Sequence, residues 1–322
     1  MGKRVLVTGA SGLIGRHLVR QLLTRGDEPI IFSRRHSIPS LETTRIEIRE
    51  GDLRRPESVA AATRGCDVII HAAGEVFDRQ QMKTTNVDGM KNLLSLLPRE
   101  VQQLIVVSSI GVIGAVSDAQ VSENSPCHPE NEYEITKLES ERLALEFGRT
   151  GAVRVAALRP TNVFGERENV GRPDSFAALL RVIDKGRFVY FGRSASANYV
   201  YAGDVAAACI SAMESDVTGV VHINDPCSLE QFVSAAADAL GVRRPSIRVP
   251  KAIAYSLASA LQVAGAITRR RPPLTMNRVR ALTSRTIYVS NRIPREMPWQ
   301  PPYGYAEGLK RTVAHYRKIG LL

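Results

Sequence analysis

A tyrosine and a lysine suited to acid–base chemistry stand four residues apart in the segment Tyr133-Glu-Ile-Thr-Lys137. On a helix this spacing places both side chains on one face, one turn apart. A free tyrosine has a pKa near ~10 and is a poor base at neutral pH, but a nearby lysine cation favours the phenolate. The pair therefore predicts a tyrosine that exchanges a proton with a substrate, with Lys137 bringing its pKa into working range.

A serine at the end of a buried strand can act together with these two residues. The run Leu104-Ile-Val-Val-Ser-Ser-Ile110 is apolar until it reaches its two serines. A hydroxyl at that place can hydrogen-bond a carbonyl or alkoxide oxygen in an adjoining pocket. Because a tyrosine and a lysine at this spacing also occur by chance on protein surfaces, the prediction depends on this serine and on the glycine motif described next.

Three glycines follow the first strand of the chain at a spacing of three residues. The β-branched run Val5 to Thr8 leads into Gly9, Gly12 and Gly15, and an amphipathic helix with leucines at the four-residue step continues to Gly26. Free backbone N–H groups and the helix dipole at such a turn attract a phosphate, and glycines let the backbone approach it. The segment predicts a bound dinucleotide, in preference to a glycine-rich turn without a ligand.

The end of the second strand indicates which dinucleotide is bound. The strand reads Ile30-Ile-Phe-Ser-Arg-Arg35, with Ser33 where NAD-binding chains carry an acidic residue about 20 residues past the glycines. A carboxylate there would repel a 2′-phosphate, whereas Arg34 and Arg35 would attract it. We therefore expect NADP in preference to NAD; the alternative is that one or both arginines belong to a solvated loop.

Apolar runs alternate with helical stretches as far as about Pro160, which predicts βαβ units and a parallel sheet. The expected strands are 29–32, 46–48, 68–72, 104–107 and 153–158, and the expected helices are 56–63, 80–97 and 134–147. Residues 217–224 read as one more strand. The fold class is thus α/β, a Rossmann-like doubly wound sheet. We expect a dinucleotide-binding domain over residues 1–165, with 196–224 returning to it, and a smaller, interrupted substrate-binding domain over 166–195 and 225–322.

The composition of the chain limits the classes of ligand and partner that are expected. The net charge of +11 suits an anionic ligand, but aromatic residues make up only 6% and no basic block is interleaved with them, so nucleic acid is disfavoured. The four cysteines have no CxxC spacing, which favours reduced thiols in a cytoplasmic protein and disfavours a metal site or disulfides. The N-terminus runs directly into a strand, so no signal peptide is expected.

One nearly uncharged segment, from Ala252 to Thr268, is followed by Arg269-Arg270-Arg271. Its 17 residues include several polar side chains and are marginal for crossing a membrane. We expect a partly buried helix of the second domain. Contact with a membrane surface is the less favoured alternative.

Taken together and in this order, the motifs resemble those of the extended short-chain dehydrogenases/reductases, also called the NAD-dependent epimerase/dehydratase family. The resemblance covers almost the whole chain. The matching segments are Thr8-Gly-Ala-Ser-Gly-Leu-Ile-Gly15, Gly51-Asp-Leu53, His71-Ala-Ala-Gly74, Thr85-Asn-Val-Asp-Gly89, Ser108-Ser109, Tyr133 to Lys137, and Arg159-Pro-Thr-Asn-Val-Phe-Gly165.

The resemblance implies hydride transfer at a carbon that bears oxygen, and a homodimer. Tyr133 would donate or accept the proton, Lys137 would also hold the nicotinamide ribose, Ser109 would orient the substrate oxygen, and Asn86 would support the site. Asp52 and Leu53 would flank the adenine. The cofactor-binding residues would be Gly9, Ser11, Gly12, Leu13, Ile14, Gly15, Ser33, Arg34, Arg35, Asp52, Leu53, Ala72, Ala73, Gly74, Tyr133, Lys137 and Pro160.

The sequence leaves more than one reaction and more than one class of substrate open. Epimerases of the family usually retain NAD, and 4,6-dehydratases carry an acidic pair where this chain has Ile110 and Gly111. Carbonyl reduction or alcohol oxidation is therefore the leading prediction, ahead of nucleotide-sugar epimerisation.

Asn162 matches a position that contacts the diphosphate of nucleotide sugars. The phosphate-binding arginine usual before the strand Tyr199-Val-Tyr201 is replaced, since Ala197-Asn198 stands there, although Arg193 is close enough in sequence to substitute. A nucleotide-linked sugar is the expected substrate. A sterol or lipid alcohol is one alternative, and a cofactor-bound regulator without turnover is another.

Overall fold

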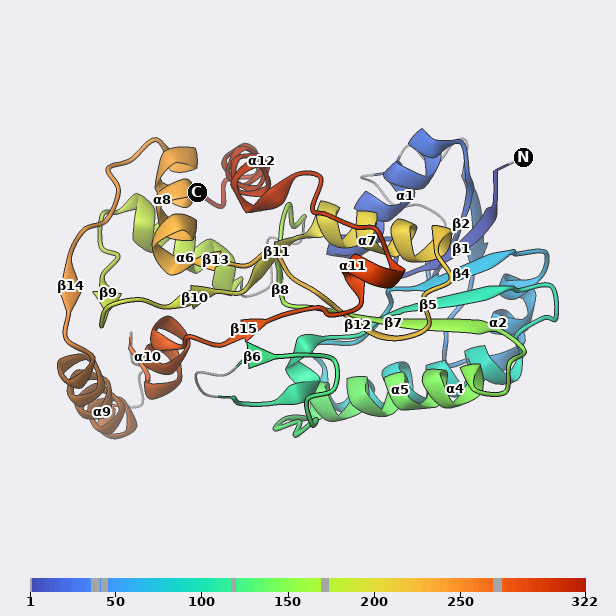
Figure 1. The fold of residues 1–322 in the computed structure, drawn as a ribbon, viewed down its shortest axis with the longest axis horizontal. Coiled ribbons are helices and arrows are strands. Elements are labelled where there is room, and N and C mark those ends of the chain that lie inside the picture. The colour runs from blue at the N-terminus through green and yellow to red at the C-terminus, as the bar shows by residue number, and fades with distance from the viewer. Residues whose placement is uncertain (1, 36–40, 42–45, 117–119, 169–173, 269–273) are drawn as a thin grey trace.

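The central sheet consists of seven parallel strands in the order β12-β7-β5-β4-β1-β2-β3 (Figure 1). The computed structural model describes the chain except for residues 1, 36–40, 42–45, 117–119, 169–173 and 269–273 and the side chains of 263–268. The strands are β1 Arg4–Thr8, β2 Glu28–Ser33, β3 Glu47–Glu50, β4 Val68–His71, β5 Gln103–Val107, β7 Arg154–Pro160 and β12 Gly219–Ile223. The strand order reverses between β1 and β4, and in such sheets ligands bind at the carboxyl ends beside that point.

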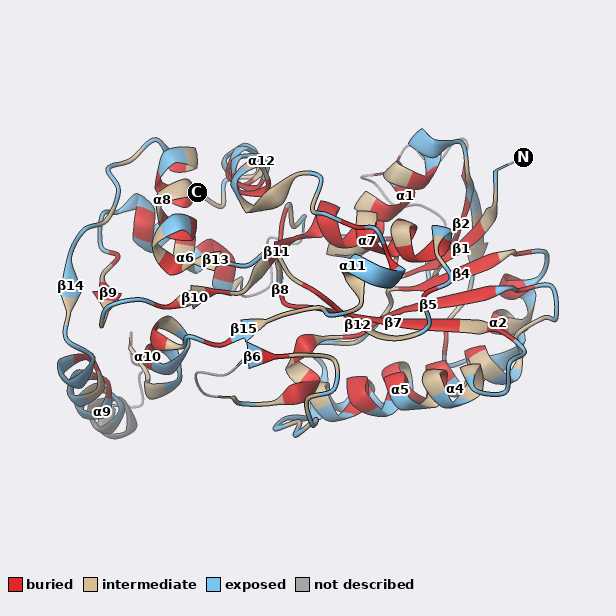
Figure 2. Ribbon diagram, in the orientation of Figure 1, coloured by how far each residue is buried: buried red, intermediate tan, exposed pale blue. Residues whose placement is uncertain are grey.

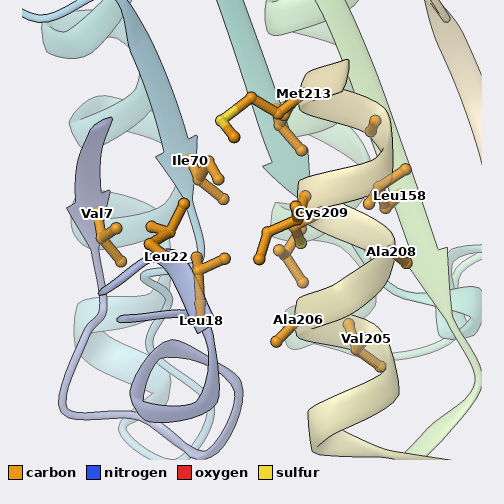
Figure 3. Packing of buried hydrophobic residues seen from close by; sticks show 14 of the residues in the cluster. Val7, Leu18, Leu22, Ile70, Leu158, Val205, Ala206, Ala208, Cys209 and Met213 are labelled. Atoms are coloured by element: carbon orange, nitrogen blue, oxygen red, sulfur yellow. The ribbon is translucent and has the colours of Figure 1, made fainter. Parts of the chain in front are cut away.

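Helices cover both faces of this sheet, which confirms the predicted doubly wound α/β fold. One face carries α1 (Leu13–Arg25) and α7 (Ala202–Glu214), and the other carries α2 (Pro56–Thr63), α4 (Gly89–Ser95) and α5 (Glu132–Gly148). Figure 3 shows Leu18 and Leu22 of α1 facing Cys209 and Met213 of α7 over the sheet residue Ile70. The leucine spacing that predicted α1 is thus the spacing that fills this core.

The single helix expected over 80–97 is broken into three pieces. After α3 (Arg79–Met82) comes a π-helical turn, Lys83–Asp88, and then α4. Asn86 lies in this wider turn and is buried. Its Oδ1 accepts the N–H of Glu75 at 2.7 Å, and its Nδ2 donates to the carbonyl oxygen of Glu75 and to Thr136 Oγ1. Single π-helical turns inside helices are frequent at functional sites.

The C-terminal part of the chain lies beyond the carboxyl ends of the strands (Figure 1). This part of the chain contributes strands to short two-stranded sheets. They pair β8 Asn162–Phe164 with β11 Tyr199–Tyr201, β6 Gln120–Val121 with β15 Ile287–Tyr288, β9 Tyr190–Phe191 with β14 Arg248–Val249, and β10 Ser196–Ala197 with β13 Cys227–Ser228. Its helices are α6 Ser175–Asp184, α8 Leu229–Leu240, α9 Lys251–Thr268, α10 Met276–Thr283, α11 Ile293–Glu296 and α12 Gly304–Lys318. Its core contains a cluster of aromatic rings, in which Tyr199 is stacked on Phe232 at a centroid distance of 4.5 Å.

A buried ion pair joins α5 to the sheet. Arg159, near the end of β7, donates to Glu141 of α5 through Nε at 2.9 Å and through Nη2 at 2.5 Å. The hydroxyl of Ser108, just after β5, donates to the same carboxylate at 2.6 Å. Both charged side chains are at most 4% exposed. The position of α5, which carries Tyr133 and Lys137, is therefore set by contacts with two strands.

We expect Glu141→Gln to destabilise the protein. The substitution keeps the shape of the side chain but leaves the buried guanidinium of Arg159 without a counter-charge, which typically costs about 3–5 kcal/mol. Urea denaturation should show this loss in the free energy of unfolding. Glu139→Gln, on an exposed site of the same helix, should change it by less than about 0.5 kcal/mol. Equal stability of the two variants would contradict the role given to this ion pair.

Candidate active site

Close backbone contacts in the first loop leave space only for glycines at its three glycine positions. Gly9 has a φ of +73°, and a Cβ there would lie 2.6 Å from the amide nitrogen of Ala73, at the end of β4. The N–H of Gly12 donates to the carbonyl oxygen of Gly9 at 2.8 Å. A Cβ on Gly15 would lie only 2.2 Å from that same oxygen. The loop thus packs tightly between the ends of β1 and β4 in a form that larger residues would disrupt.

The N-terminus of α1 presents backbone N–H groups suited to an anion. Gly12 caps the helix without a side-chain hydrogen bond, and the first turn contains no acidic residue. The N–H groups of Leu13 and Ile14 therefore lack a capping side chain, and Ser11 and Gly12 beside them are exposed. These features fit the diphosphate of a dinucleotide.

Cationic side chains gather at the end of β2. The carbonyl oxygen of Ser33 accepts the N–H of Gly51 at 2.9 Å, which places Asp52 and Leu53 beside this strand end. The side chains of Arg34 and Arg35 are exposed, and neither guanidinium is hydrogen-bonded to another described residue. This end of the site would suit the phosphorylated ribose of a dinucleotide.

Arg54 is a further cation that the sequence analysis missed. Its hydrogen bonds to Asp52, the shortest at 2.6 Å, lower the pKa of that carboxyl, and its Nη1 also donates to Gln81 Oε1 at 3.0 Å. The charge of Arg34 acts on Asp52 in the same direction. The signal for Arg54 was its place directly after the segment Gly51-Asp-Leu53.

Ser109 and Tyr133 come together at the carboxyl end of β5. Ser109 begins the 3₁₀ turn Ile110–Ile113, where its Oγ accepts the N–H of Gly111 at 3.1 Å, and its side chain lies near enough to Tyr133 to affect the pKa of that hydroxyl. Burial raises the pKa of the Tyr133 hydroxyl above its usual value; the side chain of Ser109 opposes this rise and the charge of Glu134 adds to it. The structure thus reverses the expectation that Lys137 lowers this pKa.

The Lys137 ammonium group lies against the carboxyl end of β5. Its Nζ donates to the carbonyl oxygen of Val107 at 2.7 Å, and the residue is 5% exposed. Burial lowers the pKa of Lys137 to about 8, partly offset by the negative charge of Glu141. A Cβ built on Gly74 would lie 4.0 Å from this Nζ and 3.4 Å from Asn86 Oδ1. Asn86, Gly74 and Lys137 therefore meet at one place.

His71 is a neighbour of this group that the sequence analysis did not single out. Its Nδ1 is hydrogen-bonded to Thr8 Oγ1 at 2.9 Å, joining β1 to β4. Burial lowers its pKa to about 3, and the charge of Lys137 contributes. The imidazole is therefore neutral at physiological pH and adds no positive charge beside Lys137. Ala72 and Ala73 follow it and are half-buried, and Pro160 is buried at the end of β7.

The two residues expected to hold a substrate diphosphate are not joined to each other. Asn162 is exposed, and its Nδ2 donates to the carbonyl oxygen of Asn198 at 3.0 Å. Arg193 is exposed between β9 and β10. Two further arginines, missed by the sequence analysis, reach this connection: Arg248 donates to the carbonyl oxygen of Arg193, and Arg285 donates to that of Ser194. The connection therefore brings three arginines together, of which Arg248 is also paired with Glu230 at 2.9 Å.

The model of the family described as "NAD dependent epimerase/dehydratase family" matches residues 5–224. The chain is 29% identical to sterol demethylase protein B of Methylococcus capsulatus, over 98% of this chain and 99% of that protein. It is 24% identical to N-acetyl-alpha-D-glucosaminyl-diphospho-ditrans,octacis-undecaprenol 4-epimerase of Escherichia coli O157:H7, over 98% and 96%. Its fold matches UDP-glucose 4-epimerase from Thermotoga maritima with a TM-score of 0.74, at 22% identity over 98% and 99% of the two chains.

We expect Lys137→Met to stabilise the protein at neutral pH. The pKa of Lys137 is about 8 when folded and 10.5 in its ordinary state, so the cost of its buried charge is fully present below pH 8 and disappears as the pH rises towards 10.5. After allowance for the lost bond to Val107, the gain at pH 7 should be about 2 kcal/mol.

Urea denaturation at pH 7, 9 and 10.5 measures this gain, which should shrink at each step. Lys91→Met, on an exposed site of α4, serves as the matched control and should show no such trend. A gain that stays constant with pH would contradict the lowered pKa of Lys137.

Proposed function

The chain belongs to the NAD-dependent epimerase/dehydratase family, and we propose that within it the protein is an NADP-dependent reductase or dehydrogenase acting at a carbon that bears oxygen. The observation that carries this proposal is that Ser109 and Tyr133 lie together at the carboxyl end of β5, where the Nζ of the buried Lys137 donates to the carbonyl oxygen of Val107. A bound nicotinamide would supply or accept the hydride. The proton must then come from, or return to, a protein group.

Tyr133 is the group placed to handle that proton. Its raised pKa keeps the phenol protonated at neutral pH, which is the form that donates to a carbonyl oxygen as it is reduced. Ser109 would hold the same oxygen, and Asn86 would fix the adjoining loop through its two bonds to Glu75. These roles support reduction as the favoured direction.

We expect Tyr133→Phe to lower kcat by about 10²–10⁴ because the variant lacks the proton donor. Oxidation of NADPH, followed with a panel of keto sugars linked to nucleotides and of steroid ketones, gives the rate. Binding of NADPH, followed by fluorescence, should remain close to that of the wild type. Tyr255→Phe, on α9, is the control. Retention of most of the wild-type rate by Tyr133→Phe would exclude the proposed mechanism.

The preference for NADP rests on the end of β2. Ser33 leaves this strand end without a carboxylate, and the exposed Arg34 and Arg35 stand beside it. A charge-assisted hydrogen bond from a guanidinium to a 2′-phosphate contributes roughly 1.5–3 kcal/mol. One such bond would favour NADPH over NADH by about tenfold or more.

We expect the double variant Ser33→Asp, Arg34→Ala to prefer NADH, because the aspartate would accept the ribose hydroxyls and repel the phosphate. Fluorescence titrations with both reduced cofactors measure the reversal. Arg64→Ala, exposed at the end of α2, should keep the wild-type order. Equal or tighter binding of NADH by the wild-type protein would contradict the preference and would favour an epimerase that retains NAD.

For the substrate we propose a nucleotide-linked sugar, held at its diphosphate by Asn162 and by the cationic connection around Arg193. A sterol-type alcohol is the second candidate, because the relative from M. capsulatus aligns over almost its whole length and because Val76 and Phe77, in the loop after β4, are nearly half exposed. Calorimetry of the NADP-saturated protein with nucleoside diphosphates separates the two. Binding of one of them supports the sugar, and binding of none supports the sterol.

A further inference from the structure

The positive charge of the protein is concentrated in one stretch of sequence. Residues 239–295 contain twelve of the 43 lysines and arginines of the chain and none of its 32 aspartates and glutamates. The rest of the chain is therefore close to neutral. Three of these cations, Arg269–Arg271, lie outside the described residues. Of the others, Lys251 at the start of α9 and Arg280 on α10 are exposed.

The helix within this stretch, α9, carries an apolar strip that faces solvent. Ile253 is 56% exposed and Leu257 is 51% exposed, and with the exposed Ala260 they follow the i, i+4, i+7 spacing of one helix face. The neighbouring face, with Ala254 and Ala258, is buried against α10. Figure 2 shows α9 as a largely exposed helix at the end of the molecule opposite the central sheet.

Among the helices that the structure describes, none has the length and apolar character needed to cross a bilayer. A helix with an exposed apolar strip, within a stretch whose charged residues are all cationic, suits the plane of an anionic membrane surface. Each lysine or arginine near an anionic leaflet adds about 1 kcal/mol of attraction. The neighbouring apolar side chains gain free energy when they leave water.

We propose that α9 docks the protein on the surface of a membrane that contains anionic lipids, with Ile253 and Leu257 entering the interface and the cations of residues 239–295 attracting the headgroups. Two other occupants fit less well. A second copy of the chain would bring two stretches of the same charge together. Nucleic acid would pair with the cations but would leave the apolar strip unexplained.

Cosedimentation of the full-length protein with vesicles tests the proposal. We expect binding to vesicles of phosphatidylcholine mixed with phosphatidylglycerol, weak binding to phosphatidylcholine alone, and a loss of binding as salt is raised. The variant Ile253→Ser, Leu257→Ser should bind at least tenfold more weakly. Val182→Ser, which removes a side chain of similar exposure from α6, should bind as the wild type does.

Leu257→Trp provides a second readout that does not depend on loss of binding. The native Trp299 is 8% exposed, so its emission should change little, whereas a tryptophan at position 257 should shift to shorter wavelength when anionic vesicles are added. NADPH binding should be equal in all variants, because α9 lies outside the cofactor site.

The proposal would be overturned by three results. The first is wild-type protein that fails to sediment with the anionic vesicles. The second is equal binding by Ile253→Ser, Leu257→Ser and the wild type. The third is tighter binding of a duplex oligonucleotide than of the vesicles, with no spectral shift in Leu257→Trp.

Discussion

The buried contact between Arg159, Glu141 and Ser108 is the constraint on which the rest of the site depends. It joins α5 to the ends of β5 and β7, and all three elements supply residues to the site. One turn before Glu141 on the same helix, Lys137 reaches the carbonyl oxygen of Val107, again at the end of β5. The helix that carries Tyr133 is thus held against the sheet by a buried ion pair and by hydrogen bonds.

Burial of this contact has an electrostatic consequence for the chemistry. Burial of the groups around this contact raises the pKa of Tyr133 and lowers that of Lys137. Glu141 moderates the second shift, and His71 remains neutral beside it. The protein therefore keeps one ammonium group buried at a cost in stability and keeps the phenol protonated. A cost in stability from a buried charged group is typical of functional sites.

The two ends of the proposed cofactor site are built differently. At the diphosphate end, glycines and the start of α1 provide backbone N–H groups, and the geometry leaves no room for side chains. At the adenosine end, arginines from separate loops meet around Asp52. Beyond the carboxyl ends of the strands, the C-terminal part adds a cationic connection and then a helix with an exposed apolar strip. Both the proposed substrate contacts and the proposed membrane contact lie in this outer part of the molecule.

The sequence by itself determined the features that local rules control. The glycine spacing, the alternation of strands and helices, and the lysine four residues after the tyrosine each follow from short-range geometry, and the fold they predicted is confirmed. Tertiary structure alone decided the π-helical turn around Asn86, because a one-residue expansion leaves the apolar periodicity nearly unchanged. It also decided the direction of the Tyr133 pKa, because desolvation depends on every element packed around the phenol. Tertiary structure likewise decided that Ile253 and Leu257 are exposed. The sequence of an apolar helix does not show whether a neighbouring element or solvent covers its surface.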